Sequence, residues 1–291
     1  MLELTLLTYL ALFCAIVGLW IGRVVWVCTY AVAVALGYAS GVLSGPAIIW
    51  IALFAGLCLA LTRAQRSLPA AGARAVIALA VLGIVVVALG LGMHVLPGFH
   101  NFLVVRGVVL TPGASPYTLY LNFDKATIGI LIIGLLLPPL LRGARDWLNA
   151  LRRALPVIVA NLALVAVLSV SFGYIAFEPK WNPLFWIWAA SNLFITCLSE
   201  EAFFRGFLQR GLERLLASRS GRQWIALAVA SLLFGLAHFG GGLLYVVLAT
   251  VAGAGYGLAY QRSGRLEMAM LAHFSLNAFH FLFFTYPALA R

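Results

Sequence analysis

Apolar runs of about twenty residues follow one another along the whole chain, separated by short stretches that contain glycine, proline or basic residues. About 20 residues of α-helix cross the hydrocarbon core of a bilayer, and each run therefore predicts a membrane-spanning helix. Two runs are short, and a count of nine spans is open beside the full set of ten. The pattern predicts an all-α, polytopic transmembrane helical bundle of about nine to ten spans: Leu2–Gly22, Val24–Leu43, Ala47–Leu61, Ala75–Met93, Ala126–Leu141, Pro156–Phe177, Leu184–Phe207, Trp224–Phe239, Leu243–Tyr260 and Leu266–Tyr286.

The longest interruption of this pattern, residues 94–125, contains several prolines, glycines and aromatic residues. That composition predicts a structured loop outside the membrane, in which His94 and His100 are surface residues. We therefore expect residues 1–155 to form an N-terminal transmembrane region of five spans and this external loop. Residues 156–291 are expected to form a separate C-terminal helical bundle.

The composition excludes an ordinary soluble protein, because 64% of the residues are hydrophobic and only 9% are charged, against about 45–50% and 25% in soluble domains. The net charge of +11 does not indicate a nucleic-acid partner, since the basic residues form short clusters between spans and no single patch. Four cysteines lie singly in apolar runs, which favours neither disulfides nor a zinc knot.

The basic clusters also predict an orientation, because Lys and Arg near span ends stay on the cytoplasmic side. With the N-terminus outside, most of them become cytoplasmic, and only Arg106, Lys125, Lys180 and Arg291 fall outside. We expect a multi-pass protein of a bacterial inner (plasma) membrane.

Within the predicted spans, charged residues concentrate in the segment from Cys197 to Arg205. A charge in hydrocarbon costs roughly 2.5 to 3.5 kcal/mol on insertion scales, so such residues are normally paired or functional. Glu201 and Arg205 are four residues apart and can pair on one helix face, which leaves Glu200 directed elsewhere as a candidate general base. The alternative is a polar clamp that merely joins helices.

Two further segments favour the functional interpretation. His238 lies in an apolar helix before three glycines, and His273 and Asn277 are four residues apart on one face of another. Each alone can be a packing residue. Together with the carboxylates they supply a base, a second proton-handling group and oxyanion donors, the set that hydrolysis needs. Because straight helices would hold Glu200, His238 and His273 at different depths, we expect helix tilt or the nearby glycines to bring them together.

These residues resemble the motifs of a known family. Glu200-Glu201-Ala-Phe-Phe-Arg205 resembles the EExxxR motif of the CPBP family of CAAX proteases and bacteriocin-processing enzymes (the Abi family), Phe234 to His238 its FxxxH motif and His273 to Asn277 its HxxxN motif. The resemblance implies an intramembrane endopeptidase related to type II CAAX prenyl endopeptidases, with the catalytic bundle in residues 156–291 and the N-terminal spans a subfamily extension. It further implies that Glu200 and His238 activate water, that His273 and Asn277 stabilise the oxyanion, and that Glu201 and Arg205 support the site.

Several alternatives stay open at this level. Glu200, His238 and His273 form a possible zinc set, but the chain lacks the HExxH spacing, and we favour a metal-free glutamic mechanism with no cofactor. A non-catalytic immunity or scaffold protein of the same fold and an ion- or proton-coupled transporter are the competing functions. The expected partners are the membrane and a protein or peptide substrate whose identity, like the oligomeric state, the sequence does not reveal.

Overall fold

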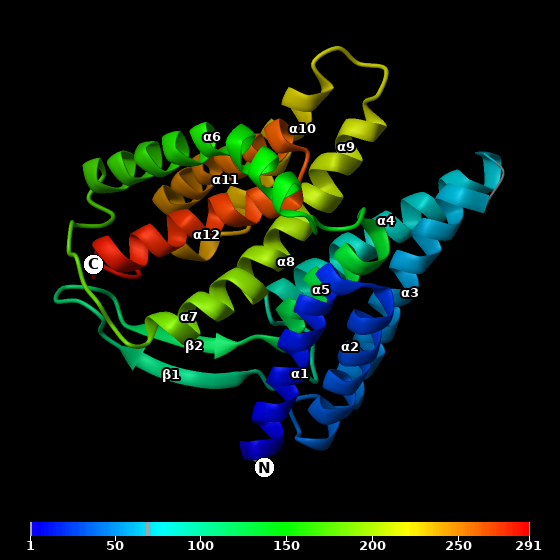
Figure 1. Cartoon of the computed structure of the whole chain (residues 1–291), viewed down its shortest axis with the longest axis horizontal. Helices are drawn as coiled ribbons and strands as arrows, with labels where there is room; N and C mark the ends of the chain where they lie inside the picture. Colours follow the sequence, from blue (N-terminus) through cyan, green and yellow to red (C-terminus); the bar gives the residue numbers. More distant parts are fainter. Residues whose placement is uncertain (1, 68–69, 291) are drawn as a thin grey trace. The chain divides into compact units, whose positions relative to one another are not determined.

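The computed structural model describes residues 2–67 and 70–290, and the chain is almost entirely helical (Figure 1). This confirms the predicted all-α, polytopic bundle, and each predicted span falls on a helix or a continuous helical stretch. By length and apolar composition alone, five of the described helices can cross a membrane: α1, α3, α4, α6 and α11. Two more, α2 and α10, are apolar but shorter. Arg291, predicted to be external, lies outside the described residues.

The chain divides into two compact units. Unit 1 comprises residues 1–102 and 121–139, and unit 2 comprises residues 103–120 and 140–291. The sequence-based boundary at residue 155 stays a prediction.

Unit 1 is a bundle of five helices, α1 (Leu2–Ile21), α2 (Arg23–Ala39), α3 (Gly45–Ser67), α4 (Ala70–Gly92) and α5 (Phe123–Leu136). Helix α1 pairs with α2 and α3 with α4, while α5 packs against α1, α3 and α4. Close packing requires Gly134, because a Cβ there would lie 2.5 Å from the ring of Trp26. Helix α5 ends before Pro138 and Pro139, and the predicted end at Leu141 is therefore five residues too late.

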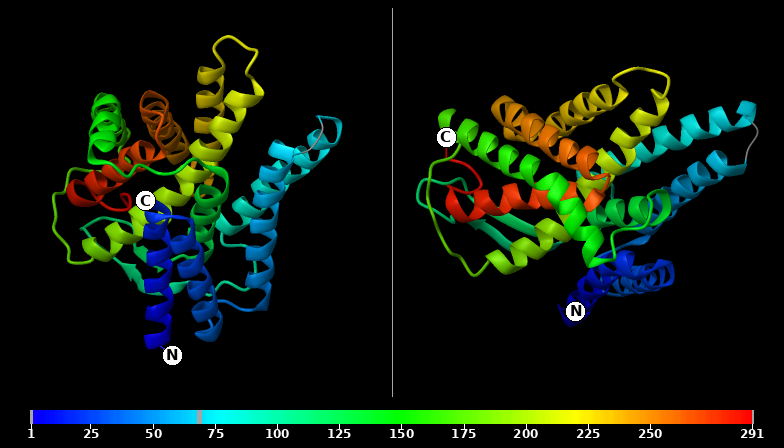
Figure 2. Two further views of the ribbon diagram at one scale, coloured as in Figure 1. Left: turned by 45° about the vertical axis from the view of Figure 1, so that its right-hand side comes forward. Right: turned by 45° about the horizontal axis from the view of Figure 1, so that its top comes forward.

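Unit 2 consists of a two-stranded sheet and a helical bundle. Helix α11 packs against α6, α10 and α12, and Figures 1 and 2 show α6, α11 and α12 side by side. Its elements are β1 (Phe102–Val108), β2 (Tyr117–Leu121), α6 (Ala144–Ser171), α7 (Phe185–Ser191), η1 (Asn192–Cys197), α8 (Leu198–Glu201), η2 (Ala202–Gln209), α9 (Arg210–Leu215), α10 (Arg222–Leu236), η3 (Phe239–Gly241), α11 (Leu243–Ser263) and α12 (Leu266–Phe283).

Helix α6 corrects the predicted start of a span at Pro156, because it already begins at Ala144 and contains the proline. A proline inside a helix removes one backbone hydrogen bond. Here the helix continues on both sides of it, with Ala154 and Ile158 both buried.

The predicted external loop contains β1 and β2, which are hydrogen-bonded to each other. Leu119 of β2 joins Trp188 of α7 and Phe281 of α12 in a buried apolar cluster. The C-terminal tail contacts the turn between the strands, with Ser115 N–H donating to the carbonyl of Ala288 (2.9 Å). These contacts tie the hairpin, α7 and the tail together at one end of unit 2.

Candidate active site

The paired glutamates lie on a continuous helical stretch with unusual turns. Helix α8 carries Glu200 and Glu201, and the π-helical segments η1 and η2 directly precede and follow it. A π-helical turn contains an extra residue and redirects the side chains around it, and such turns are frequent at functional sites. Regular helical spacing in the sequence does not reveal them.

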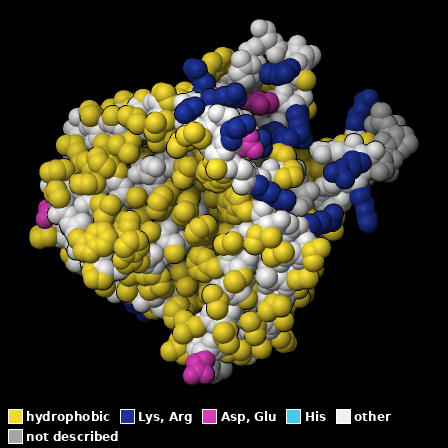
Figure 3. Space-filling model, viewed as in Figure 1, with side chains coloured by type: hydrophobic (Ala, Val, Ile, Leu, Met, Phe, Trp, Pro, Cys, Tyr) yellow, Lys and Arg dark blue, Asp and Glu magenta, His cyan; other side chains and the backbone are white. Residues whose placement is uncertain are grey.

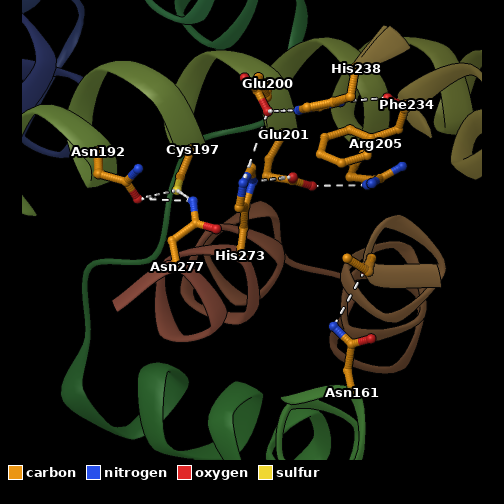
Figure 4. Close-up of polar contacts among 11 residues, drawn as sticks. Asn161, Asn192, Cys197, Glu200, Glu201, Arg205, Phe234, His238, His273 and Asn277 are labelled. Carbon is orange, nitrogen blue, oxygen red and sulfur yellow. Dashed lines mark hydrogen bonds and ion pairs between the residues drawn. The ribbon is translucent and has the colours of Figure 1, made fainter. Parts of the chain in front are cut away.

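Glu201 is the centre of a buried ion-pair network (Figure 4). One of its carboxylate oxygens, Oε2, accepts a hydrogen bond from Arg205 Nε at 2.9 Å, which confirms the predicted pair. The other oxygen, Oε1, lies 2.9 Å from Nδ1 of His273. Because the side chains of Glu201 and Arg205 are both 0% exposed, the network is fully inside the protein and links η2 to α12.

The remaining guanidinium nitrogens of Arg205 face aromatic rings. Within the described part of the chain, Nη1 and Nη2 have no hydrogen-bond partner, but the guanidinium carbon lies 5.1 Å from the ring centroid of Phe234 and 6.0 Å from that of Phe204. Such cation–π contacts stabilise a buried cation. A Cβ at Gly253 would lie 3.1 Å from Cδ1 of Phe234 and 3.3 Å from Nη2, so α11 passes closely by the arginine at this glycine.

Glu200 faces both imidazoles. Its Oε2 lies 4.0 Å from Nε2 of His238 and 3.9 Å from Nε2 of His273, and Figure 4 shows the two rings directed at this carboxylate. Its side chain is only 13% exposed. The three residues that the sequence expected to converge thus do so.

His238 reaches this position by a route that the sequence only partly anticipates. Helix α10 ends at Leu236, and His238 follows it, whereas the sequence placed His238 within the helix. Its Nδ1 lies 2.7 Å from the carbonyl oxygen of Phe234. Because a carbonyl can only accept, Nδ1 carries the hydrogen, and in the neutral ring Nε2 presents a lone pair to Glu200. Gly235 is one of the nearby glycines expected to help the site residues converge. A Cβ there would lie 2.7 Å from the carbonyl oxygen of Val246, so the glycine allows α10 to approach α11.

Asn277 is held by two residues that the sequence analysis missed. Its Nδ2 donates to Asn192 Oδ1 at 3.1 Å and lies 4.0 Å from Cys197 Sγ. Cys197 in turn donates to Asn192 Oδ1 at 3.3 Å. The signal available in the sequence is an amide within an apolar span, Asn192, five residues before Cys197.

Tyrosine rings form the wall beside the two histidines. Tyr256 of α11 is buried and stacks on the His273 ring with a centroid distance of 4.5 Å and an interplanar angle of 13°. Tyr245 meets the His238 ring edge-on at 5.4 Å and stacks on Tyr174. Tyrosines in an apolar span are common packing residues, and the sequence pattern does not distinguish these from the others.

A cavity lies against these groups. Three of the predicted catalytic residues line it: His238, His273 and Asn277. Residues of α6, of α11 and of the segment after α12 complete the lining. His280, which shares a face of α12 with His273, also lines the cavity. Its Nε2 donates to the carbonyl oxygen of Thr285 at 3.0 Å. His238, His273 and Asn277 are thus accessible from a space inside unit 2.

The donors do not form a metal site as they stand. Among the described residues, no group of three or more His, Cys, Asp or Glu side chains has the arrangement that holds a metal ion. Nε2 of both histidines is about 4 Å from the same carboxylate oxygen, farther than the roughly 3.3 Å that separates two donors on one tetrahedral zinc ion. The conditional zinc set Glu200, His238 and His273 therefore does not fit a metal in this arrangement.

Comparison with known proteins gives one family match. Residues 180–279 match the family described as type II CAAX prenyl endopeptidase Rce1-like. This confirms the resemblance that the three sequence motifs indicated, and the matched segment contains every predicted site residue. No curated protein and no solved structure is significantly similar to the chain.

Proposed function

We propose that the protein is a glutamic-type intramembrane endopeptidase, because residues 180–279 match the family described as type II CAAX prenyl endopeptidase Rce1-like. Its substrate is a peptide bond of a membrane-associated protein or peptide that enters the cavity beside Glu200. The reaction is hydrolysis by water, with the protein's own side chains carrying the protons.

In the first step Glu200 acts as general base. A water molecule between Glu200 Oε2 and His238 Nε2, which are 4.0 Å apart, loses a proton to the carboxylate as its oxygen attacks the substrate carbonyl. The bond from His238 Nδ1 to the Phe234 carbonyl keeps Nε2 as an acceptor that orients this water.

His273 and Asn277 stabilise the charge that develops on the carbonyl oxygen. One N–H of the Asn277 amide donates to Asn192, and the other, which has only the long 4.0 Å contact to Cys197 Sγ, donates to the oxyanion. Glu201 accepts a hydrogen bond from Nδ1 of His273, and in the doubly protonated, cationic ring Nε2–H is then the donor directed into the site. A preorganised donor in a site that excludes water contributes roughly 3 to 4 kcal/mol to such a transition state.

The tetrahedral intermediate then collapses. The carbon–nitrogen bond breaks, and the proton that Glu200 took from water passes to the leaving amine. Two peptide termini result, and Glu200 returns to its ionised form without any other reactant.

The observation that supports this function most is that both imidazole Nε2 atoms lie within about 4 Å of one Glu200 oxygen beside a cavity. The test compares protein N-termini in membranes of cells that express the wild type, Glu200→Gln or His238→Ala. We expect cleavage products that need both residues. Asp146→Asn, the same carboxylate-to-amide change at an exposed site of unit 2, is the matched control. Identical termini in all four samples would instead favour a non-catalytic member of the family.

A further inference from the structure

The cavity beside the candidate active site extends from Tyr256 and His273, near the middle of α11 and α12, toward one end of each helix that lines it. The lining includes Ser169 near the end of α6, His238 after α10, Tyr245 near the start of α11 and His280 near the end of α12. The segments that follow α6 and α12 complete it with Tyr174 and Phe284. The successive helices α10, α11 and α12 thus contribute their last, first and last turns, together with middle turns of α11 and α12. The cavity therefore lies between the middle of unit 2 and a single face of it.

Arginines mark the opposite ends of the same helices. Figure 3 shows Lys and Arg side chains gathered over the ends of α9 and α10, while the visible surface over the far ends of α6 and α12 is hydrophobic. Ten arginines of unit 2 lie at or near these ends: Arg142, Arg145, Arg152, Arg153, Arg210, Arg214, Arg219, Arg222, Arg262 and Arg265.

The two sets are separated by most of a bilayer. Along the chain, 15 to 17 residues separate each lining residue at a helix end from the nearest arginine toward the opposite end of the same helix. At about 1.5 Å per helical residue this is roughly 22 to 26 Å. The lining residues compared are Ser169, His238, Tyr245 and His280. His273 is eight residues from Arg265 and Glu200 ten from Arg210, or roughly 12 to 15 Å. The reactive carboxylate is therefore near the middle of a hydrocarbon core about 30 Å thick, and the cavity extends from it away from the arginines.

Arginines at span ends stay on the cytoplasmic side of a membrane, since moving them across is costly. We infer that the active-site cavity receives its substrate from the side of the membrane opposite to the cytoplasm. This inference rests on the proposed function and specifies its substrate class: an exported or membrane-spanning polypeptide whose scissile bond lies in the outer half of the bilayer. A lipid-modified C-terminus made and kept in the cytoplasm would approach from the arginine-rich face, where no part of the described cavity lining lies.

Cysteine labelling in intact cells tests this inference without requiring a known substrate. The background is the full chain with Cys14, Cys28 and Cys58 changed to alanine, and with the buried Cys197 retained as an unlabelled reference. Ser169→Cys and, as a second variant, Ala166→Cys place a thiol on the cavity wall. Val109→Cys, after β1, and Ser220→Cys, between α9 and α10, are exposed controls at opposite ends of unit 2.

A membrane-impermeant maleimide is added before or after the membrane is disrupted, and labelling is measured as a gel shift. We expect Ser169→Cys or Ala166→Cys to react in intact cells together with Val109→Cys, and Ser220→Cys to react only after disruption. Two outcomes would overturn the inference. In the first, the cavity thiols react only after disruption, as Ser220→Cys does. In the second, they never react although both controls do. Labelling is independent of catalysis, so a wrong side of access and an absent protease activity are separate results.

Discussion

An imidazole meets a buried carboxylate in both units, but only one of these pairs lies in a candidate active site. In unit 1, His94 Nδ1 lies 2.7 Å from Asp124 Oδ2, at the start of α5. In unit 2, His273 Nδ1 lies 2.9 Å from Glu201 Oε1. The two pairs share residue types, distance and a carboxylate that is nearly inaccessible to solvent.

The difference lies in what surrounds each pair. Asp124 is fully engaged, because Oδ1 also accepts hydrogen bonds from Asn101 Nδ2 (3.0 Å) and from the Lys125 backbone N–H (2.8 Å). Its histidine is 39% exposed at the side chain. His273 instead directs its second nitrogen at Glu200, a carboxylate that a second histidine also faces beside a cavity. An imidazole–carboxylate pair thus only stabilises the fold unless another reactive group and a space for substrate lie next to it.

The largest expected effect separates the two units directly. Glu200→Gln removes the general base while keeping the side-chain shape, and we expect cleavage to fall by about 10²- to 10⁴-fold, as for loss of general acid–base catalysis. Asp124→Asn should leave cleavage close to the wild-type rate. The measurement is the rate of appearance of Glu200-dependent N-termini per folded protein, and equal losses in both variants would remove the functional distinction between the units.

The next effect concerns stability. Glu201→Gln leaves Arg205 buried without its counter-ion, and breaking a buried pair in this way costs about 3–5 kcal/mol. We expect a lower thermal unfolding midpoint in detergent. The double variant Glu201→Gln/Arg205→Met removes both charges and should recover most of the midpoint but not the cleavage, because His273 still lacks its partner; a stable Glu201→Gln single variant would contradict the proposed network.

The sequence predicted the fold class and the site cluster for one physical reason: charged and polar residues are so rare in these spans that each is informative. Glu201 and Arg205 were paired from helical spacing alone, and the structure confirms the pair. The convergence of Glu200, His238 and His273 was expected from their types but depends on tertiary features.

Those tertiary features explain what the sequence could not predict. The end of α10 before His238 and the π-helical turns around α8 depend on packing between helices, which local spacing does not encode. Asn192 was missed because a single amide in a span is usually a packing residue. The start of α6 was missed because Pro156 resembles a helix boundary, although the helix continues through it.

A smaller effect tests the positioning role of Asn192. Asn192→Leu removes the oxygen that holds the Asn277 amide, and a displaced catalytic group can cost up to about 10²-fold in rate. We expect kcat to fall by about tenfold or more with KM nearly unchanged. Asn192→Asp, which keeps the accepting oxygen, should recover part of kcat, whereas a role limited to packing predicts no difference between the two variants.

The contribution of the His94–Asp124 pair to the stability of unit 1 can also be tested. Asp124→Asn weakens the acceptor of three hydrogen bonds, and we expect a loss of about 1–3 kcal/mol, typical of a buried polar group left poorly paired. His94→Ala should lower the unfolding midpoint less, because its side chain is more exposed. Unchanged midpoints in both variants would contradict a stabilising role.

The smallest expected effect is that of a chelator. Glu200 and the two histidines supply zinc-type donors, but the described residues do not arrange them as a metal set. We therefore expect the rate of Glu200-dependent cleavage to be the same before and after treatment of the purified protein with 1,10-phenanthroline. Cleavage that is lost with the chelator and restored by Zn²⁺, but not by Mg²⁺, would show that the three donors rearrange around a metal. The contrast between the units would then rest on metal binding, which the fully engaged Asp124 cannot offer, and the carboxylate of Glu200 would be assigned as a ligand.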